Sequence, residues 1–192
     1  MTEEATEAPT AAPELTERAK KLLAQNPDTV GYITIADTQV DNPVVQTIDN
    51  EYYLNHGFDG QEFRAGTVFM DCADYFGADP ADWSENIILY GHNMADNSMF
   101  GSLRRYRQDP EYYKQNPFIT FSSNYADYTY VMFPIDVKYG DDILTLSTCY
   151  SDEDNSRFLI VARRLREGED TQTLLAKIQG GATEETTAAA QE

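Results

Sequence analysis

Short apolar runs separated by polar loops make up most of the chain, and most of these runs have the length of a β-strand. Their β-branched and aromatic residues predict strands at 30–35, 42–46, 66–71, 86–92, 118–122, 128–133, 142–149 and 157–165. The runs at 128–133 and 157–165 are almost continuously apolar, which is typical of strands buried on both faces.

Helical spacing is limited to a few places. Pro13 followed by ELTERAKKLLAQN predicts an N-terminal helix that ends at Asn26 and Pro27. One helical turn is expected at 50–58, and a helix at 97–108 that Asp109-Pro110 either ends or continues by a turn. Strands and helices do not alternate regularly. The pattern therefore predicts a mostly β fold, a closed and largely antiparallel barrel with an N-terminal helix and a few peripheral helices.

One domain fits a chain of 192 residues, with the folded part at 13–179. The segments 1–12 and 180–192 contain Ala, Thr, Glu, Pro and Gly and almost no large apolar residue. Such segments bury too little surface to offset the entropy of ordering, so we expect both to be flexible.

The net negative charge of the chain disfavours some classes of binding partner. The chain has 33 acidic and 14 basic residues, and its two ends contribute only six of the acids. An acidic surface repels phosphate backbones and anionic lipids, which argues against binding to nucleic acid or to a membrane surface. It favours cationic or neutral partners, although simple solubility also explains it. No apolar run approaches the roughly 18 residues that cross a bilayer, so any membrane anchor is expected outside this chain.

Candidate chemistry is concentrated at the ends of three predicted strands. Cys149 ends the run LTLSTC, and Arg157 opens the next apolar run eight residues later. If these runs pair antiparallel, the two residues lie at neighbouring strand ends. His92 also ends a strand-like run. A thiol, an imidazole and a guanidinium are therefore expected at one rim of the barrel, where loops leave room for a substrate.

Each of these groups has a use in acyl transfer. A cysteine thiolate attacks an amide or ester carbonyl to form a thioester, and an imidazole moves the protons of the departing and incoming amines. A guanidinium, permanently charged, stabilises the oxyanion or holds a substrate carbonyl. Taken singly the signals are weak, because a strand cysteine is most often a small core residue.

The remaining cysteine and histidine are expected to be structural. Cys72 follows a strand without a nearby arginine, and His56 lies beside a predicted helix end. No group of Cys and His residues has the spacing of metal ligands, and no cofactor is predicted.

The combination of motifs resembles one family. TLSTC at 145–149 followed by Arg157 resembles the sortase signature, and YGHNM at 90–94 resembles the histidine segment of class B sortases. The blocks NPDTVGYITI, NPVVQTIDNEYYLNHGFDG, GTVFMD, SENIILYGHNM, MFGSL and ILTLSTC follow the class B order. The resemblance covers roughly residues 15–167.

The resemblance implies an eight-stranded sortase-type barrel and a cysteine transpeptidase at the outer face of the membrane of a Gram-positive bacterium. It implies that Cys149 cleaves a C-terminal sorting signal of the Asn-Pro-x-Thr or Leu-Pro-x-Thr kind after its threonine. The acyl group then passes to an amino group of a peptidoglycan precursor or a pilin lysine. No metal or cofactor is implied.

Individual residues take roles from the same resemblance. Cys149 corresponds to the nucleophile, His92 to the acid–base and Arg157 to the oxyanion-stabilising or substrate-positioning cation. The substrate groove is expected to include Ser147, Thr148 and Asn93.

Two departures from class B stand out. The connection 134–141 is short where class B members carry a long insertion that forms a wall of the signal-binding groove, which puts the substrate preference in question. Tyr150 stands where an acidic residue is common. The loop after Cys149 contains Asp152, Glu153 and Asp154, which either attract a cationic amine or form a solvated turn.

Three other interpretations remain open. An L,D-transpeptidase is disfavoured because that family usually has glycine before its cysteine, where this chain has Thr148. A hydrolytic cysteine peptidase differs only in whether water or an amine resolves the thioester. A non-catalytic, acidic binding domain that keeps a sortase-like barrel does not need Cys149, His92 and Arg157 together.

Overall fold

A computed structural model describes residues 13–149 and 156–180 of the protein. Eight strands form one closed barrel in the order β1-β2-β3-β4-β7-β8-β6-β5. Their bounds are β1 Thr29–Thr34, β2 Asp41–Val45, β3 Phe69–Met70, β4 Asn86–Tyr90, β5 Phe118–Ser123, β6 Asp127–Met132, β7 Ile143–Cys149 and β8 Arg157–Arg164. The predicted mostly β barrel is confirmed.

Helices lie around the barrel and are short. They are α1 Glu17–Leu23, α2 Arg105–Gln108, α3 Pro110–Gln115 and α4 Thr171–Gly180, with 3₁₀ turns η1 Tyr52–Leu54, η2 Pro80–Asp82 and η3 Gly101–Arg104. Thr16 caps α1 by accepting a hydrogen bond from the backbone of Ala19, so α1 begins later than the Pro13 start that the sequence suggested. α4 follows Asp170, packs beside α3 and was not predicted.

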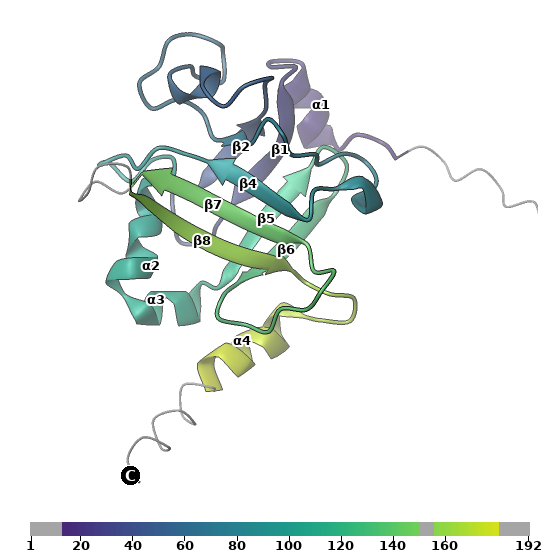
Figure 1. Cartoon of the computed structure of the whole chain (residues 1–192), viewed down its shortest axis with the longest axis vertical. Helices are drawn as coiled ribbons and strands as arrows, with labels where there is room; N and C mark the ends of the chain where they lie inside the picture. The colour runs from purple at the N-terminus through teal and green to yellow at the C-terminus, as the bar shows by residue number, and fades with distance from the viewer. Residues whose placement is uncertain (1–12, 150–155, 181–192) are drawn as a thin grey trace, which may run out of the picture.

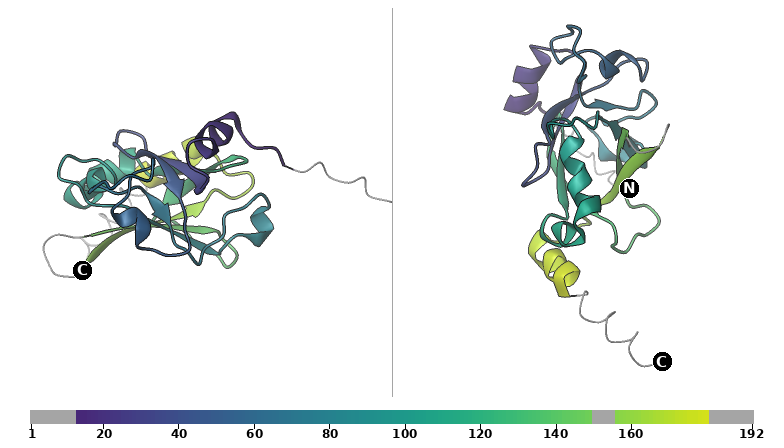
Figure 2. Two further views of the ribbon diagram at one scale, coloured as in Figure 1. Left: turned by 90° about the horizontal axis from the view of Figure 1, so that it is seen from above. Right: turned by 90° about the vertical axis from the view of Figure 1, so that its left-hand side faces the viewer.

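Most neighbouring strands are antiparallel, but two pairs are parallel. β2 runs parallel to β3, and β4 runs parallel to β7. In Figure 1 the arrows of β4 and β7 point the same way and β8 returns beside β7. The carboxyl ends of β4 and β7 and the start of β8 therefore share one rim, which faces the viewer in the right-hand view of Figure 2.

The core fills the barrel. Alternate positions of the strands point inward, among them Ile33, Leu89, Phe121, Leu144 and Leu146, and each of these five is fully buried. Two rings from the segment between β3 and β4 join the core: Phe76 stacks on Phe121, and Trp83 meets Tyr128 edge to face.

Two expectations about single strands are wrong. The predicted strand 66–71 shortens to β3, because only Phe69 and Met70 pair with β4. β8 is not buried on both faces: Leu159 is 52% exposed, whereas Arg163 on the same face is fully buried. The short connection 134–141 crosses β8 at Arg163 and leaves Leu159 open.

Among the described residues, no helix is long and apolar enough to cross a membrane. Of the segments expected to be flexible, 1–12 lies outside the described residues, as does 180–192 apart from Gly180, which is the last residue of α4.

Candidate active site

The parallel pairing of β4 and β7 positions two of the three candidate residues. Tyr90 lies opposite Ser147, and the Gly91 N–H continues the ladder by donating to the Ser147 carbonyl at 3.2 Å. His92 and Cys149 each follow this pair by two residues. Parallel strands keep equal spacing, so the backbones of His92 and Cys149 reach the rim together.

The antiparallel pair β7–β8 positions the third candidate residue, Arg157. The register places Cys149 directly opposite Arg157, and the strands are paired continuously from there to Ile143 and Arg163. Cys149 therefore stands on the central one of three adjacent strands, between His92 at the end of β4 and Arg157 at the start of β8. The structure thus brings all three predicted residues to one rim; the direction of the Cys149 side chain lies outside what it describes.

Close packing holds His92 at this rim. A Cβ on Gly91 would approach the Phe100 ring to 2.7 Å, so only glycine lets Phe100 pack there. The Phe100 N–H then donates to the His92 carbonyl at 3.0 Å. The imidazole is partly buried, and its Nε2 lies 2.8 Å from the carbonyl oxygen of Leu54.

Arg157 is exposed at the start of β8. Its Nη1 donates to the carbonyl of the preceding Ser156 at 3.4 Å. Among the described residues Arg157 makes this one hydrogen bond, and the other donors of its guanidinium suit a substrate or an oxyanion.

A tyrosine near the site is held in its neutral form. The Tyr90 hydroxyl donates to Asp71 Oδ2 at 2.8 Å, and burial together with this carboxylate raises the pKa of Tyr90 to about 12. Burial alone would raise the pKa of Asp71, but hydrogen bonds from the Ala73 backbone, Tyr90 and Asn50 lower it overall. At neutral pH Tyr90 therefore keeps its proton and Asp71 stays ionised, so this pair orients the end of β4 without supplying a proton to the rim.

The residues predicted to line the substrate groove are largely covered. Ser147 and Thr148 are 7% and 3% exposed, and the Thr148 hydroxyl has no hydrogen-bond partner among the described residues. Asn93 is partly exposed and pairs with Met99 in an isolated bridge. Contact between these residues and a substrate stays a prediction.

Cys72 and His56 lie outside the β4–β7–β8 register that brings the three rim residues together. Cys72 is exposed and follows the end of β3, which runs antiparallel to β4 and so leads away from the rim. His56 stacks on Tyr52 at 4.0 Å, and its Nδ1 lies 2.7 Å from the Tyr52 carbonyl oxygen. These contacts agree with a structural role for His56. Within the described ranges, no group of three or more His, Cys, Asp or Glu side chains could hold a metal ion.

An apolar pocket of about 420 Å³ lies along the first half of β8, beginning at the residue after Arg157. Its lining is Tyr106, Pro110, Tyr113, Met132, Phe133, Pro134, Phe158, Leu159, Ile160 and Val161. β6 ends at Met132, and its pairing with β8 ends one residue later, where the Phe133 N–H donates to the Val161 carbonyl at 3.0 Å. The residues of β8 before Val161 therefore have no β6 neighbour, and the pocket lies beside them.

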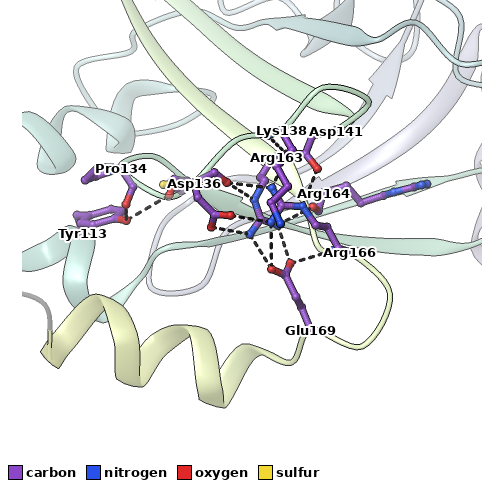
Figure 3. A network of polar contacts seen from close by, with 10 residues as sticks. Tyr113, Pro134, Asp136, Lys138, Asp141, Arg163, Arg164, Arg166 and Glu169 are labelled. Carbon is purple, nitrogen blue, oxygen red and sulfur yellow. Dashed lines mark hydrogen bonds and ion pairs between the residues drawn. The ribbon is translucent and has the colours of Figure 1, made fainter.

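Ion pairs fix the short connection 134–141 over β8 (Figure 3). The buried Arg163 donates through Nε to the Asp136 carbonyl at 2.9 Å and forms two bonds to the Glu169 carboxylate, at 2.6 and 2.9 Å. Arg166 makes a two-bond pair with Asp141, at 2.6 and 2.8 Å. Hydrogen bonding from Arg166 lowers the pKa of Asp141 to about 2. The connection is thus a short, charged strap.

Comparison with known proteins decides the family. The model of the sortase domain matches residues 33–165, more than half of the chain. The chain belongs to the sortase family. Its relatives include Sortase B of Listeria monocytogenes, 35% identical over 122 residues, which cover 64% of this chain and 48% of that protein. Sortase B of Staphylococcus aureus is 32% identical over 139 residues, which cover 72% and 55%. This sortase thus spans about half the length of these relatives.

Solved structures agree with the assignment. Sortase B of Clostridium perfringens superposes with a TM-score of 0.70 at 26% identity, covering 77% of this chain and 99% of that one. A substrate complex of Staphylococcus aureus sortase B gives a TM-score of 0.71 at 25% identity, covering 80% and 87%. The class B resemblance of this sortase is therefore confirmed.

Sequence reasoning missed the backbone group that contacts His92. The Leu54 carbonyl comes from a segment 38 residues away, and nothing in the pattern NEYYLNHGF indicates that its main chain reaches the rim. The pairing of Tyr90 with Asp71 was likewise not predicted.

Proposed function

We propose that this sortase is a cysteine transpeptidase that cleaves a C-terminal sorting signal and transfers the acyl group to an amine. The observation that carries the proposal is the register of β4, β7 and β8, which brings His92, Cys149 and Arg157 to one rim. The signal is of the Asn-Pro-x-Thr or Leu-Pro-x-Thr kind, cut after threonine. The acceptor is an amino group of a peptidoglycan precursor or a pilin lysine, at the outer face of the membrane of a Gram-positive bacterium.

The proposed reaction has two halves. Cys149 loses its thiol proton to His92, and the thiolate attacks the threonine carbonyl. The oxyanion is stabilised by Arg157 until the C–N bond breaks, and His92 returns the proton to the departing amine. A thioester remains on Cys149. An incoming amine then gives a proton to His92, attacks the thioester and releases the thiolate.

The apolar pocket along β8 supports a peptide substrate. It begins at the residue after Arg157 and is lined by aromatic, aliphatic and prolyl side chains, which suit the proline of either signal and the leucine of a Leu-Pro-x-Thr signal. We propose that the strap 134–141, in place of a longer wall, leaves this side of the groove open to a wider range of signals.

The proposal is tested by incubating the protein with a panel of sorting peptides and one amine acceptor at a time. The acceptors are an oligoglycine, a diamino-acid peptide and a pilin-type lysine peptide. Mass spectrometry should show a covalent adduct on Cys149 equal to the acyl part of the signal, and a transfer product that depends on the amine. A free-acid product at all amine concentrations would indicate a hydrolytic peptidase. Peptide binding without cleavage would indicate a non-catalytic sortase-like domain.

A further inference from the structure

The hydrogen bond between His92 and Leu54 restricts the chemistry of the imidazole. A carbonyl oxygen only accepts, so at 2.8 Å from the Leu54 oxygen Nε2 must carry a hydrogen. The imidazolium has a hydrogen on both nitrogens. When it loses one, the hydrogen bond to Leu54 retains the hydrogen on Nε2. The proton that comes and goes is then the proton on Nδ1.

The Leu54 carbonyl is held firmly in place. The carbonyls on either side of it are already bonded: Tyr53 O accepts from Thr67 N at 3.0 Å, and Asn55 O accepts from Phe63 N at 2.8 Å. The Tyr53 side chain is 3% exposed. Its hydroxyl joins Asn26 and Asp28, each at 2.8 Å. The turn η1 is thereby tied to the body of the protein and presents one carbonyl to His92.

Gly66 packs directly against this carbonyl. Its φ is +59°, and a Cβ built there would collide with the Tyr53 oxygen and lie 2.8 Å from the Leu54 oxygen. A side chain at this position would push the Leu54 carbonyl from its place. Gly60, in the same segment with φ +75°, has room for a Cβ, whose nearest neighbour would be the Tyr52 hydroxyl at 3.7 Å.

We propose that the Leu54 carbonyl is the positioning group of His92, holding it as the Nε2–H tautomer so that all proton transfer runs through Nδ1. The thiol proton of Cys149 moves to Nδ1 as the thiolate forms, and the same proton leaves Nδ1 with the departing amine. The incoming amine later returns a proton to Nδ1. The role in transfer rests on the proposed function; the tautomer does not.

The other histidine supplies an internal control. His56 makes the same kind of contact through its other nitrogen, with Nδ1 2.7 Å from the Tyr52 carbonyl. The same reasoning gives His56 the Nδ1–H tautomer. The two histidines of the chain are thus expected to be opposite tautomers in one molecule.

The test is long-range ¹H–¹⁵N NMR of the full chain with labelled histidine, at a pH where both rings are neutral, with His56→Gln used for assignment. His92 should show the Nε2–H pattern and His56 the Nδ1–H pattern. A His92 ring in the Nδ1–H form, or divided evenly between the two forms, overturns the proposal without any variant.

The positioning role of the Leu54 carbonyl is tested by measuring acyl transfer in two glycine variants. Gly66→Ala should reduce the Nε2–H population of His92 and lower kcat for transfer at least tenfold, with a smaller change in the KM of the signal peptide. Gly60→Ala, which shares the backbone strain, should change neither. An altered tautomer in Gly66→Ala with unchanged kcat overturns the role in transfer. If the wild-type protein forms no acyl adduct at all, the proposed function fails, and the NMR result still decides the tautomer.

Discussion

Removing the charge of Glu169 should destabilise the protein strongly, because it leaves Arg163 buried without its main partner. The Arg163 side chain is fully buried and Glu169 is 22% exposed, with two bonds of 2.6 and 2.9 Å between them. Glu169→Gln keeps the shape but turns an amide donor toward the guanidinium. Breaking a buried pair costs about 3–5 kcal/mol. Asp136 remains 3.7 Å from Arg163, so the low end, about 3 kcal/mol, is expected.

The assay is chemical and thermal unfolding of the full chain. A loss of about 3 kcal/mol corresponds to a fall in Tm of roughly 6–12 °C for a domain of this size. The matched control is Glu111→Gln, whose carboxylate also pairs at 2.7 Å but is 66% exposed, and which should cost less than about 1 kcal/mol. Equal losses for the two variants would refute the reasoning that burial sets the strength of the Arg163–Glu169 pair.

The same pair predicts a pH dependence. Hydrogen bonding from Arg163, the largest cause, lowers the pKa of Glu169 below 4.5. A carboxyl with a lowered pKa in the folded state stabilises fully above its unfolded pKa, and this stability is lost as the pH falls through the folded pKa. The difference in unfolding free energy between wild type and Glu169→Gln should therefore be constant near pH 7 and shrink below pH 4.5. A difference that grows on acidification would contradict the assignment.

Three further predictions concern the site. Arg157→Lys should lower kcat about a hundredfold to a thousandfold, because lysine lacks the planar fork; full activity would show that charge alone suffices. Cys72→Ala should leave acyl-adduct formation and transfer unchanged, and lost activity would give Cys72 a role that its position argues against. Changing Asp152, Glu153 and Asp154 to Asn, Gln and Asn should raise the KM of a cationic amine at low salt but not at high salt. An unchanged KM at low salt would leave this loop, which lies outside the described residues, as a solvated turn.

The sequence predicted the barrel well because alternating and continuous apolar runs report directly on strands. Seven of the eight strands lie within about one or two residues of the predicted runs at each end, and the three rim residues were found from their positions at strand ends. Local pattern does not encode which distant strands are neighbours. The parallel pairing of β4 with β7, which brings His92 beside Cys149, therefore appears only in the fold.

The features that the sequence pattern did not predict depend mostly on contacts between distant segments. Leu159 is exposed although its run is apolar, because exposure depends on what the strap 134–141 covers. The helix α4 fully buries only Leu174, and its large apolar residues are limited to Leu174, Leu175 and Ile178, too short a stripe to stand out. The bond from His92 to Leu54 involves a backbone carbonyl, which every residue possesses, so no residue type could signal it.

The central claim is that Cys149 forms a thioester with a sorting signal. Intact-protein mass spectrometry after brief mixing with an Asn-Pro-x-Thr peptide and a Leu-Pro-x-Thr peptide, without amine, tests it most directly. We expect an added mass equal to the peptide acyl group up to threonine, mapped to Cys149 and discharged by a later addition of amine. A folded Cys149→Ala protein should not gain this mass. An adduct of the same mass on Cys149→Ala, or wild-type transfer rates from that variant, would contradict it.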